Sequence, residues 1–240
     1  MKRSSVIFLL IFFIFGCDSP SVTSIQLSDF DKDISVEKLG KQLMAFSHGL
    51  NALESNMSNA NEVLIGVHGR NSEGYEWVYP LKVLNTNNKE IYFYRWPDDG
   101  CYQAPAENLI LEIEGLLDTY PKIQKVTLMG HSYGGIVVSH IVENWSSETA
   151  FEAHIIASPL AGTAAFIQSC NFEPLKKIKN NIVLFEWRTQ QELDNAFKGL
   201  ENNPQDINIL GSHVTTLPDT YKGNRLGHNW SISWVADQIK

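Results

Sequence analysis

The sequence predicts a three-layer α/β domain with a mostly parallel central sheet between layers of helices. Short, continuous apolar runs recur along the chain, as is typical of strands that are covered on both faces. Segments with apolar residues three and four positions apart lie between these runs and indicate amphipathic helices. Strands that alternate with helices favour right-handed βαβ crossovers, and therefore a parallel sheet.

The elements can be placed along the chain from these patterns. Strands are predicted at 62–67, 90–96, 125–129, 154–157, 182–187 and 207–210, and helices within 34–53, 106–120, 135–145, 195–200 and 231–239. A chain of 240 residues suits one domain, which we assign to residues 34–240. Only about twenty residues separate Pro159 from Asn181, which leaves no room for a large cap domain.

The N-terminal residues 1–16 resemble a signal peptide. Lys2 and Arg3 precede an apolar run over 6–15, which is too short to span a bilayer as a helix. The following Gly16-Cys17 resembles the lipidation site of bacterial lipoproteins, although an uncleaved anchor or an ordinary secretory signal stays open. We therefore expect a polar tether over 17–33, and a domain outside the cytoplasm that lipidated Cys17 attaches to the membrane of the cell envelope.

Composition excludes some classes of partner and site. The net charge is −8 and no stretch is rich in Lys or Arg, so we do not expect binding to nucleic acid. The sequence has no CxxC, HExxH or Cys/His cluster and does not indicate a metal site. Cys101 and Cys170 form an even pair that can be a disulfide outside the cytoplasm or two free thiols, and the sequence does not decide between them.

The segment Gly130-His131-Ser132-Tyr133-Gly134 matches the G-x-S-x-G pattern of a nucleophilic serine. A predicted strand precedes it and a predicted helix follows it, as this motif requires. The serine must occupy a sharp strand-to-helix turn, where side chains two residues to either side would collide with neighbouring backbone. We therefore predict Ser132 as the nucleophile.

A second turn, Val67-His68-Gly69-Arg70, ends the strand at 62–67. A His-Gly turn at this place supplies one amide of an oxyanion hole, and the residue after the nucleophile supplies the other. The predicted donors are the backbone N–H groups of Arg70 and Tyr133. We interpret His68 as a structural residue that holds this turn.

These two motifs and a late Gly227-His228, in that order, resemble the α/β-hydrolase superfamily in its lipase/esterase branch. The resemblance covers about 62–240. It implies a Ser–Asp/Glu–His triad with no metal and no cofactor, because an imidazole must take the serine proton and a carboxylate must orient that imidazole.

The catalytic base is expected after the nucleophile and the acid. His228 follows a glycine and precedes the last predicted helix, which is the place of the base in this family. His213, at the end of the last predicted strand run, is the rival. The two other downstream histidines are interpreted as structural: His140 on the helix after the serine and His154 at the start of a strand.

The acid should follow the strand at 182–187. Asp194 and Glu192 both lie there, and Asp194 is preferred because Asp is the commoner acid in this branch of the family. The simpler interpretation of either is a solvated carboxylate at the start of a helix around 195–200. Asp206 and Asp219 are weaker candidates.

The expected reaction is hydrolysis of a carboxylic ester, of a small molecule or a lipid, through an acyl-serine intermediate. A thioesterase, amidase or acyltransferase on the same triad is an alternative, as is an inactive, membrane-anchored binding protein. Candidates for the wall of an acyl pocket are Leu160, Ala164, Phe166 and Ile167 together with Tyr75, Trp77 and Trp96.

Overall fold

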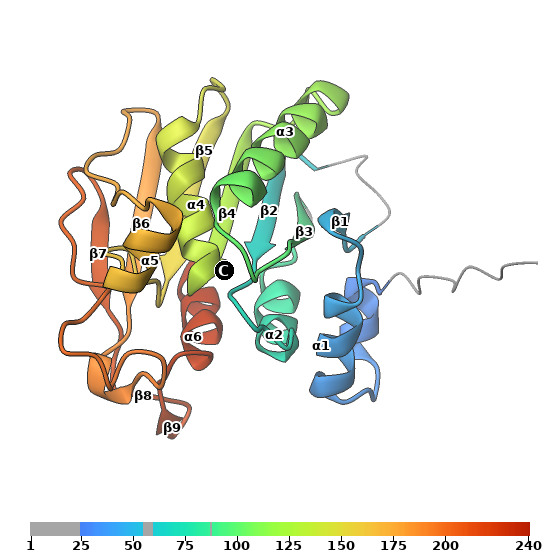
Figure 1. The fold of residues 1–240 in the computed structure, drawn as a ribbon. Helices are drawn as coiled ribbons and strands as arrows, with labels where there is room; N and C mark the ends of the chain where they lie inside the picture. The colour runs from blue at the N-terminus through green and yellow to red at the C-terminus, as the bar shows by residue number, and fades with distance from the viewer. Residues whose placement is uncertain (1–24, 55–59, 87) are drawn as a thin grey trace, which may run out of the picture.

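The computed structural model describes residues 25–54, 60–86 and 88–240. A seven-stranded sheet in the order β1-β3-β2-β4-β5-β6-β7 forms its centre (Figure 1). All neighbours are parallel except β1, which is antiparallel to β3. This confirms the predicted mostly parallel sheet. The strands are β1 (Gly49–Ala52), β2 (Glu62–Val67), β3 (Lys89–Arg95), β4 (Lys125–His131), β5 (Ala150–Ile156), β6 (Ile182–Arg188) and β7 (His213–Thr216).

Helices pack on both faces of the sheet and complete the three layers. One apolar core lies under α3 (Gln103–Thr119), α4 (Tyr133–Asn144) and the short α5 (Ala164–Cys170). The other lies under α1 (Val36–Met44), α2 (Tyr75–Val83) and α6 (Trp230–Ile239). Val63 and Ile65 of β2 face the first core and Leu64 faces the second, which explains why the strand is apolar throughout.

The connection between β5 and β6 contains α5 and no larger insertion, which confirms that the domain carries no large cap. Cys170 at the end of α5 forms a disulfide with Cys101, with the two Cα atoms 5.5 Å apart. The bond settles the open alternative of two free thiols. Two 3₁₀ turns and a small hairpin complete the fold: η1 (Leu27–Asp31), η2 (Gln191–Leu193), β8 (Thr220–Tyr221) and β9 (Asn224–Arg225).

The predicted strand at 207–210 is wrong. Leu210 makes a single bridge to Lys177 and its side chain is exposed, so the run is not buried on both sides. Gly211, with a φ of 97°, then turns the chain into β7, which pairs with β6. The predicted helix at 195–200 is also wrong. This segment forms turns whose carbonyls at Phe197 and Leu200 accept hydrogen bonds from the side chain of Gln191.

The N-terminal boundary of the domain also needs correction. The helix predicted within 34–53 covers α1 alone, and its C-terminal part is β1. The tether predicted over 17–33 is wrong from Ile25 onward, because Ile25, Leu27 and Phe30 are buried against the core on the α1 side. Polar residues separate these three apolar ones, so the sequence has no apolar run there that would predict their burial.

Residues 1–24, which include the predicted signal peptide and Cys17, lie outside the described residues. Within the ranges that the structure describes, no helix combines the length and the apolar character needed to cross a bilayer.

Candidate active site

Ser132 stands alone between β4, which ends at His131, and α4, which begins at Tyr133. Its backbone has a φ of 52° and a ψ of −122°, a conformation that side-chain-bearing residues rarely adopt. The Ser132 N–H donates to the carbonyl of Ile156 at the end of β5, 2.9 Å away, which holds the turn. Strain of this kind persists where the surroundings enforce it, and it is typical of functional positions.

The glycines around the nucleophile permit close backbone contacts. A Cβ on Gly134 would lie 2.3 Å from the carbonyl oxygen of Val67 and 2.5 Å from that of His68. A Cβ on Gly69 would lie 2.9 Å from the Cβ of Ser132. The turn after β2 therefore rests directly against the nucleophile, and only residues without a side chain fit at these two contacts.

The predicted oxyanion donors, the amides of Arg70 and Tyr133, flank this contact. Their side chains converge on one segment after β3. The guanidinium of Arg70 donates to the carbonyls of Asp98, at 2.7 Å, and Gly100, at 3.0 Å, and it stacks over the Tyr133 ring. The Tyr133 hydroxyl donates to the same Gly100 carbonyl at 2.9 Å. These contacts hold the side chains of both residues against one backbone segment after β3.

Asp194 and His228 are brought together although 34 positions separate them. Nδ1 of His228 lies 2.9 Å from Oδ2 of Asp194. The carboxylate is fully buried, and His228 shares a cavity of about 90 Å³ with Ser132, Gly69 and Arg70. The carboxylate can accept only from a protonated Nδ1, which leaves Nε2 of His228 able to take a proton.

The carboxylate of Asp194 is itself held by groups that the sequence did not single out. The hydroxyl of Thr189 donates to Oδ2 at 2.5 Å, and the N–H of Ala196 donates to Oδ1 at 2.8 Å. Gln205 receives a hydrogen bond from the Thr189 N–H at 3.0 Å. Thr189 and Ala196 lie within five positions of Asp194, and Gln205 is 16 positions from Thr189. Their contacts depend on how this loop folds, so no short motif marks them.

His131 is a further residue that sequence reasoning missed at this site. Its ring lies 4.6 Å from that of His228, centroid to centroid, and its Nε2 donates to the His228 carbonyl at 3.1 Å. The Ser231 hydroxyl donates to the same carbonyl. Burial, with the nearby His228 second, holds the pKa of His131 well below its usual range. A neutral His131 therefore positions His228 without opposing a positive charge on it.

The other candidate acids and bases lie away from this cluster. Glu192, Asp206 and Asp219 are exposed, in contrast to Asp194. His213 opens β7 and stacks on Phe185 of β6. His140 meets the ring of Tyr102, and buried His154 contacts Glu152 and Trp187.

His68 has the surroundings of a structural residue. It is buried between the rings of Phe93 and Trp96. Its Nδ1 donates to the carbonyl of Gly69 at 2.8 Å, and its Nε2 accepts from Arg95 at 2.6 Å. Burial lowers the pKa of His68 to about 4, so the ring is neutral at neutral pH and fixes the turn that carries Arg70.

The predicted pocket-wall residues have different surroundings. Tyr75 lines the cavity at Ser132, whereas Trp77, Trp96 and Leu160 are buried in the two cores. Phe166 packs edge-on against Tyr133, Ile167 is exposed, and the side chain of Ala164 lies outside the described residues. In the part of the chain that is described, no group of three or more His, Cys, Asp or Glu residues could hold a metal ion.

Comparison with known proteins supports the fold. No family model matches the chain, and no curated protein matches it in sequence. Among solved structures it is similar to a protein of unknown function from Agrobacterium tumefaciens that is described as a putative alpha/beta hydrolase, with a TM-score of 0.51, 12% identity, and coverage of 79% of this chain and 86% of that one. It is also similar to Est1E from Butyrivibrio proteoclasticus, with a TM-score of 0.50 and 14% identity over 80% of this chain and 90% of that one. An esterase of Pyrococcus furiosus is similar with a TM-score of 0.50 and 14% identity, over 75% of this chain and 78% of that one. The chain therefore has the α/β-hydrolase fold.

Proposed function

We propose that this protein is a serine hydrolase that cleaves carboxylic esters through an acyl-serine intermediate. The observation that supports this most directly is the buried Asp194–His228 pair, which opens into the cavity that contains the strained Ser132. A serine hydroxyl is a poor nucleophile at neutral pH, and an oriented imidazole is the group that activates it.

In the proposed reaction, Oγ of Ser132 attacks the ester carbonyl carbon and its proton passes to Nε2 of His228. The carbonyl oxygen becomes an oxyanion, which accepts hydrogen bonds from the amides of Arg70 and Tyr133. Collapse of this intermediate breaks the bond to the alcohol oxygen, which leaves with the proton from His228. Water then attacks the acyl-serine with His228 as the base, and the acid is released.

The nucleophile is tested by Ser132→Ala. We expect the variant to fold as the wild type does, to lose hydrolysis of 4-nitrophenyl acetate and to lose covalent labelling by a fluorophosphonate. Wild-type turnover in the variant would refute the proposal. A wild type that is labelled but turns over thioesters or amides faster than matched esters would keep the triad and change the bond that it cleaves. A wild type that is not labelled at all would favour an inactive binding protein.

For the location, we propose a membrane-anchored lipoprotein whose folded domain lies outside the cytoplasm. The lipidation pattern at Gly16-Cys17 supports this, and the Cys101–Cys170 disulfide fits an oxidising compartment. Two or three acyl chains on Cys17 anchor a protein stably where one would not. Mass spectrometry of the mature N-terminus tests the proposal, and an unmodified Cys17 or cleavage at another bond would refute it.

A further inference from the structure

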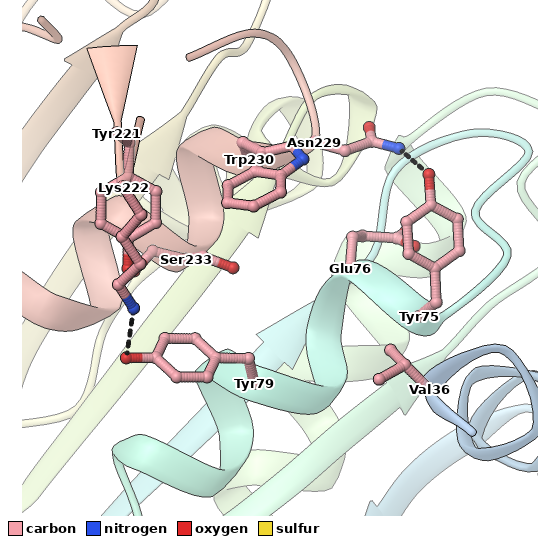
Figure 2. A pocket seen from close by; sticks show the side chains of 9 residues that line it. All are labelled: Val36, Tyr75, Glu76, Tyr79, Tyr221, Lys222, Asn229, Trp230 and Ser233. Atoms are coloured by element: carbon pink, nitrogen blue, oxygen red, sulfur yellow. Dashed lines mark hydrogen bonds between the residues drawn. The ribbon is translucent and has the colours of Figure 1, made fainter. Parts of the chain in front are cut away.

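A second cavity lies directly beside the catalytic one, in the space between α2 and α6. It has a volume of about 340 Å³. Figure 2 shows rings from both helices on its walls, with Val36 of α1 at one side. We call it the aromatic groove and define it by its apolar and cationic lining: Val36, Tyr75, Tyr79, Tyr221, Lys222 and Trp230.

The aromatic groove adjoins the catalytic cavity. Tyr75 and Asn229 line both, and so does Glu76. The side-chain amide of Asn229 donates to the Tyr75 hydroxyl at 2.9 Å, so this pair marks the boundary between the two spaces (Figure 2). A molecule whose ester carbonyl lies at Ser132 can therefore extend past this boundary into the groove.

The walls of the groove are exposed apolar groups held in place by polar contacts. Val36, Tyr75, Tyr79 and Trp230 are all among the exposed large hydrophobic residues. The hydroxyls of Tyr79 and Tyr221 both donate to the carboxylate of Asp237, at 2.7 and 2.5 Å. Rings that are fixed in this way lose little freedom when a ligand binds, and a cluster of exposed apolar side chains is typical of a binding site.

The chemistry of the lining favours an aromatic ligand. Four of the lining side chains are Tyr or Trp rings, which pair with another ring in stacked or edge-on geometry. The ammonium of Lys222 already lies over the rings of Tyr79 and Tyr221, 4.4 and 4.7 Å from their centres. That end of the groove therefore holds a cation of its own, and the open space beside Tyr75 and Trp230 is suited to a neutral ring.

The position of the groove indicates which half of an ester it receives. Asn229 and Trp230 follow His228 directly in the chain, and both line the groove. The alcohol oxygen of the ester must lie at His228, because this residue returns the proton as the alcohol leaves. We propose that the aromatic groove binds the alcohol part of the substrate, and that the substrates are esters of aryl or arylalkyl alcohols. This inference rests on the proposed ester hydrolysis at Ser132.

The kinetic test compares 2-naphthylmethyl acetate with methyl acetate. In Trp230→Ala we expect the ratio of their kcat/KM values to fall about tenfold, and in Val36→Ser about threefold, because ring contacts are lost. Val214→Ser is the matched control, since Val214 is 50% exposed against 46% for Val36 but lies on β7, away from the groove. An unchanged ratio in both groove variants, or an equal fall in the control, would overturn the proposal.

Two further experiments distinguish the acyl side of the ester from the alcohol side, and distinguish ligand binding in the groove from ester hydrolysis at Ser132. Methyl 2-naphthylacetate carries the ring on the acyl side, and an equal loss with this ester in Trp230→Ala would overturn the assignment to the alcohol. Calorimetric titration of the full chain with 2-naphthylmethanol measures the groove without turnover. We expect binding to Ser132→Ala as to the wild type, and weaker binding to Val36→Ser. No binding to the wild type would refute the groove, whether or not esters are hydrolysed.

Discussion

Replacing Asp194 by asparagine tests how the imidazole of His228 is oriented, because the two carboxylate oxygens have different donors. Oδ1 accepts from the backbone N–H of Ala196 at 2.8 Å. Oδ2 faces Nδ1 of His228 at 2.9 Å and the Thr189 hydroxyl. A backbone N–H can only donate, so the amide oxygen of an asparagine must stay toward Ala196 and its NH₂ group must face His228.

The environment can accommodate this orientation. The Thr189 hydroxyl can accept from the new NH₂ group and direct its own proton to Oε1 of Gln205, which is 3.2 Å away. The NH₂ group then donates to Nδ1 of His228 and forces the ring proton onto Nε2. Nε2 can no longer take the proton of Ser132. We therefore expect kcat to fall about 10⁴-fold, which corresponds to about 5.5 kcal/mol in the activation barrier.

The assay is the turnover of 4-nitrophenyl acetate by Asp194→Asn, with thermal unfolding to show that the variant is folded. Glu192→Gln is the matched control, because Glu192 is exposed two positions away and should keep most of its activity. Nitrogen NMR of the imidazole should show the proton on Nε2 in Asp194→Asn. A folded variant that keeps turnover within tenfold of the wild type would refute this argument.

Four other variants test three separate parts of the molecule. His228→Ala should be nearly inactive whereas His213→Ala should keep most activity toward 4-nitrophenyl acetate, and the reverse result would move the base to His213. Replacing Cys101 and Cys170 by serine opens a loop with a sequence separation of 69, so the free energy of unfolding in urea should fall by about 4 kcal/mol, and an unchanged value would contradict this. Burial raises the pKa of Glu76 above its ordinary 4.5, so its contribution to stability falls as pH rises above that value. The Tm of Glu76→Gln minus that of the wild type should therefore increase between pH 5 and pH 8. A difference in Tm that stays constant over this range would argue against a buried carboxyl with a raised pKa.

The strands in the middle of the sheet could be predicted from the sequence, because burial on both faces gives them continuous apolar runs. β2 lies between β3 and β4, both faces are covered, and the apolar run at 62–67 coincides with the strand. The predicted run at 182–187 likewise coincides with most of β6. Where a strand is covered on both sides, each residue must be apolar or hydrogen-bonded, and the pattern is then visible without a structure.

The two strands of the seven-stranded sheet that the sequence analysis does not predict, β1 and β7, are its edges. All four residues of β7 are exposed or half-buried, so no apolar run marks the strand. The nearby run at 207–210 is more apolar and was predicted instead. An edge strand is defined by its partner, here the pairing of β7 with β6, and pairing leaves little trace in composition.

The candidate site shows the same division between local and distant signals. The glycines around Ser132 follow from a steric requirement within a few residues, so the nucleophile could be predicted from the motif. Asp194 and Glu192 are two positions apart and equally acidic in sequence. Their difference is burial, because Asp194 is enclosed while Glu192 is exposed. The enclosing groups, such as Thr189 and Gln205, converge only after folding.

The disulfide between Cys101 and Cys170 fixes a segment that contacts both proposed oxyanion donors. The Gly100 carbonyl accepts from both Arg70 and Tyr133, the two residues whose amides would hold the oxyanion. The next residue, Cys101, is bonded to Cys170 at the end of α5, which fixes the segment that carries Gly100. A donor stabilises a transition state only to the extent that it is already in place when charge develops. A covalent bond outside the triad therefore helps to keep both proposed oxyanion donors in position through a single backbone carbonyl.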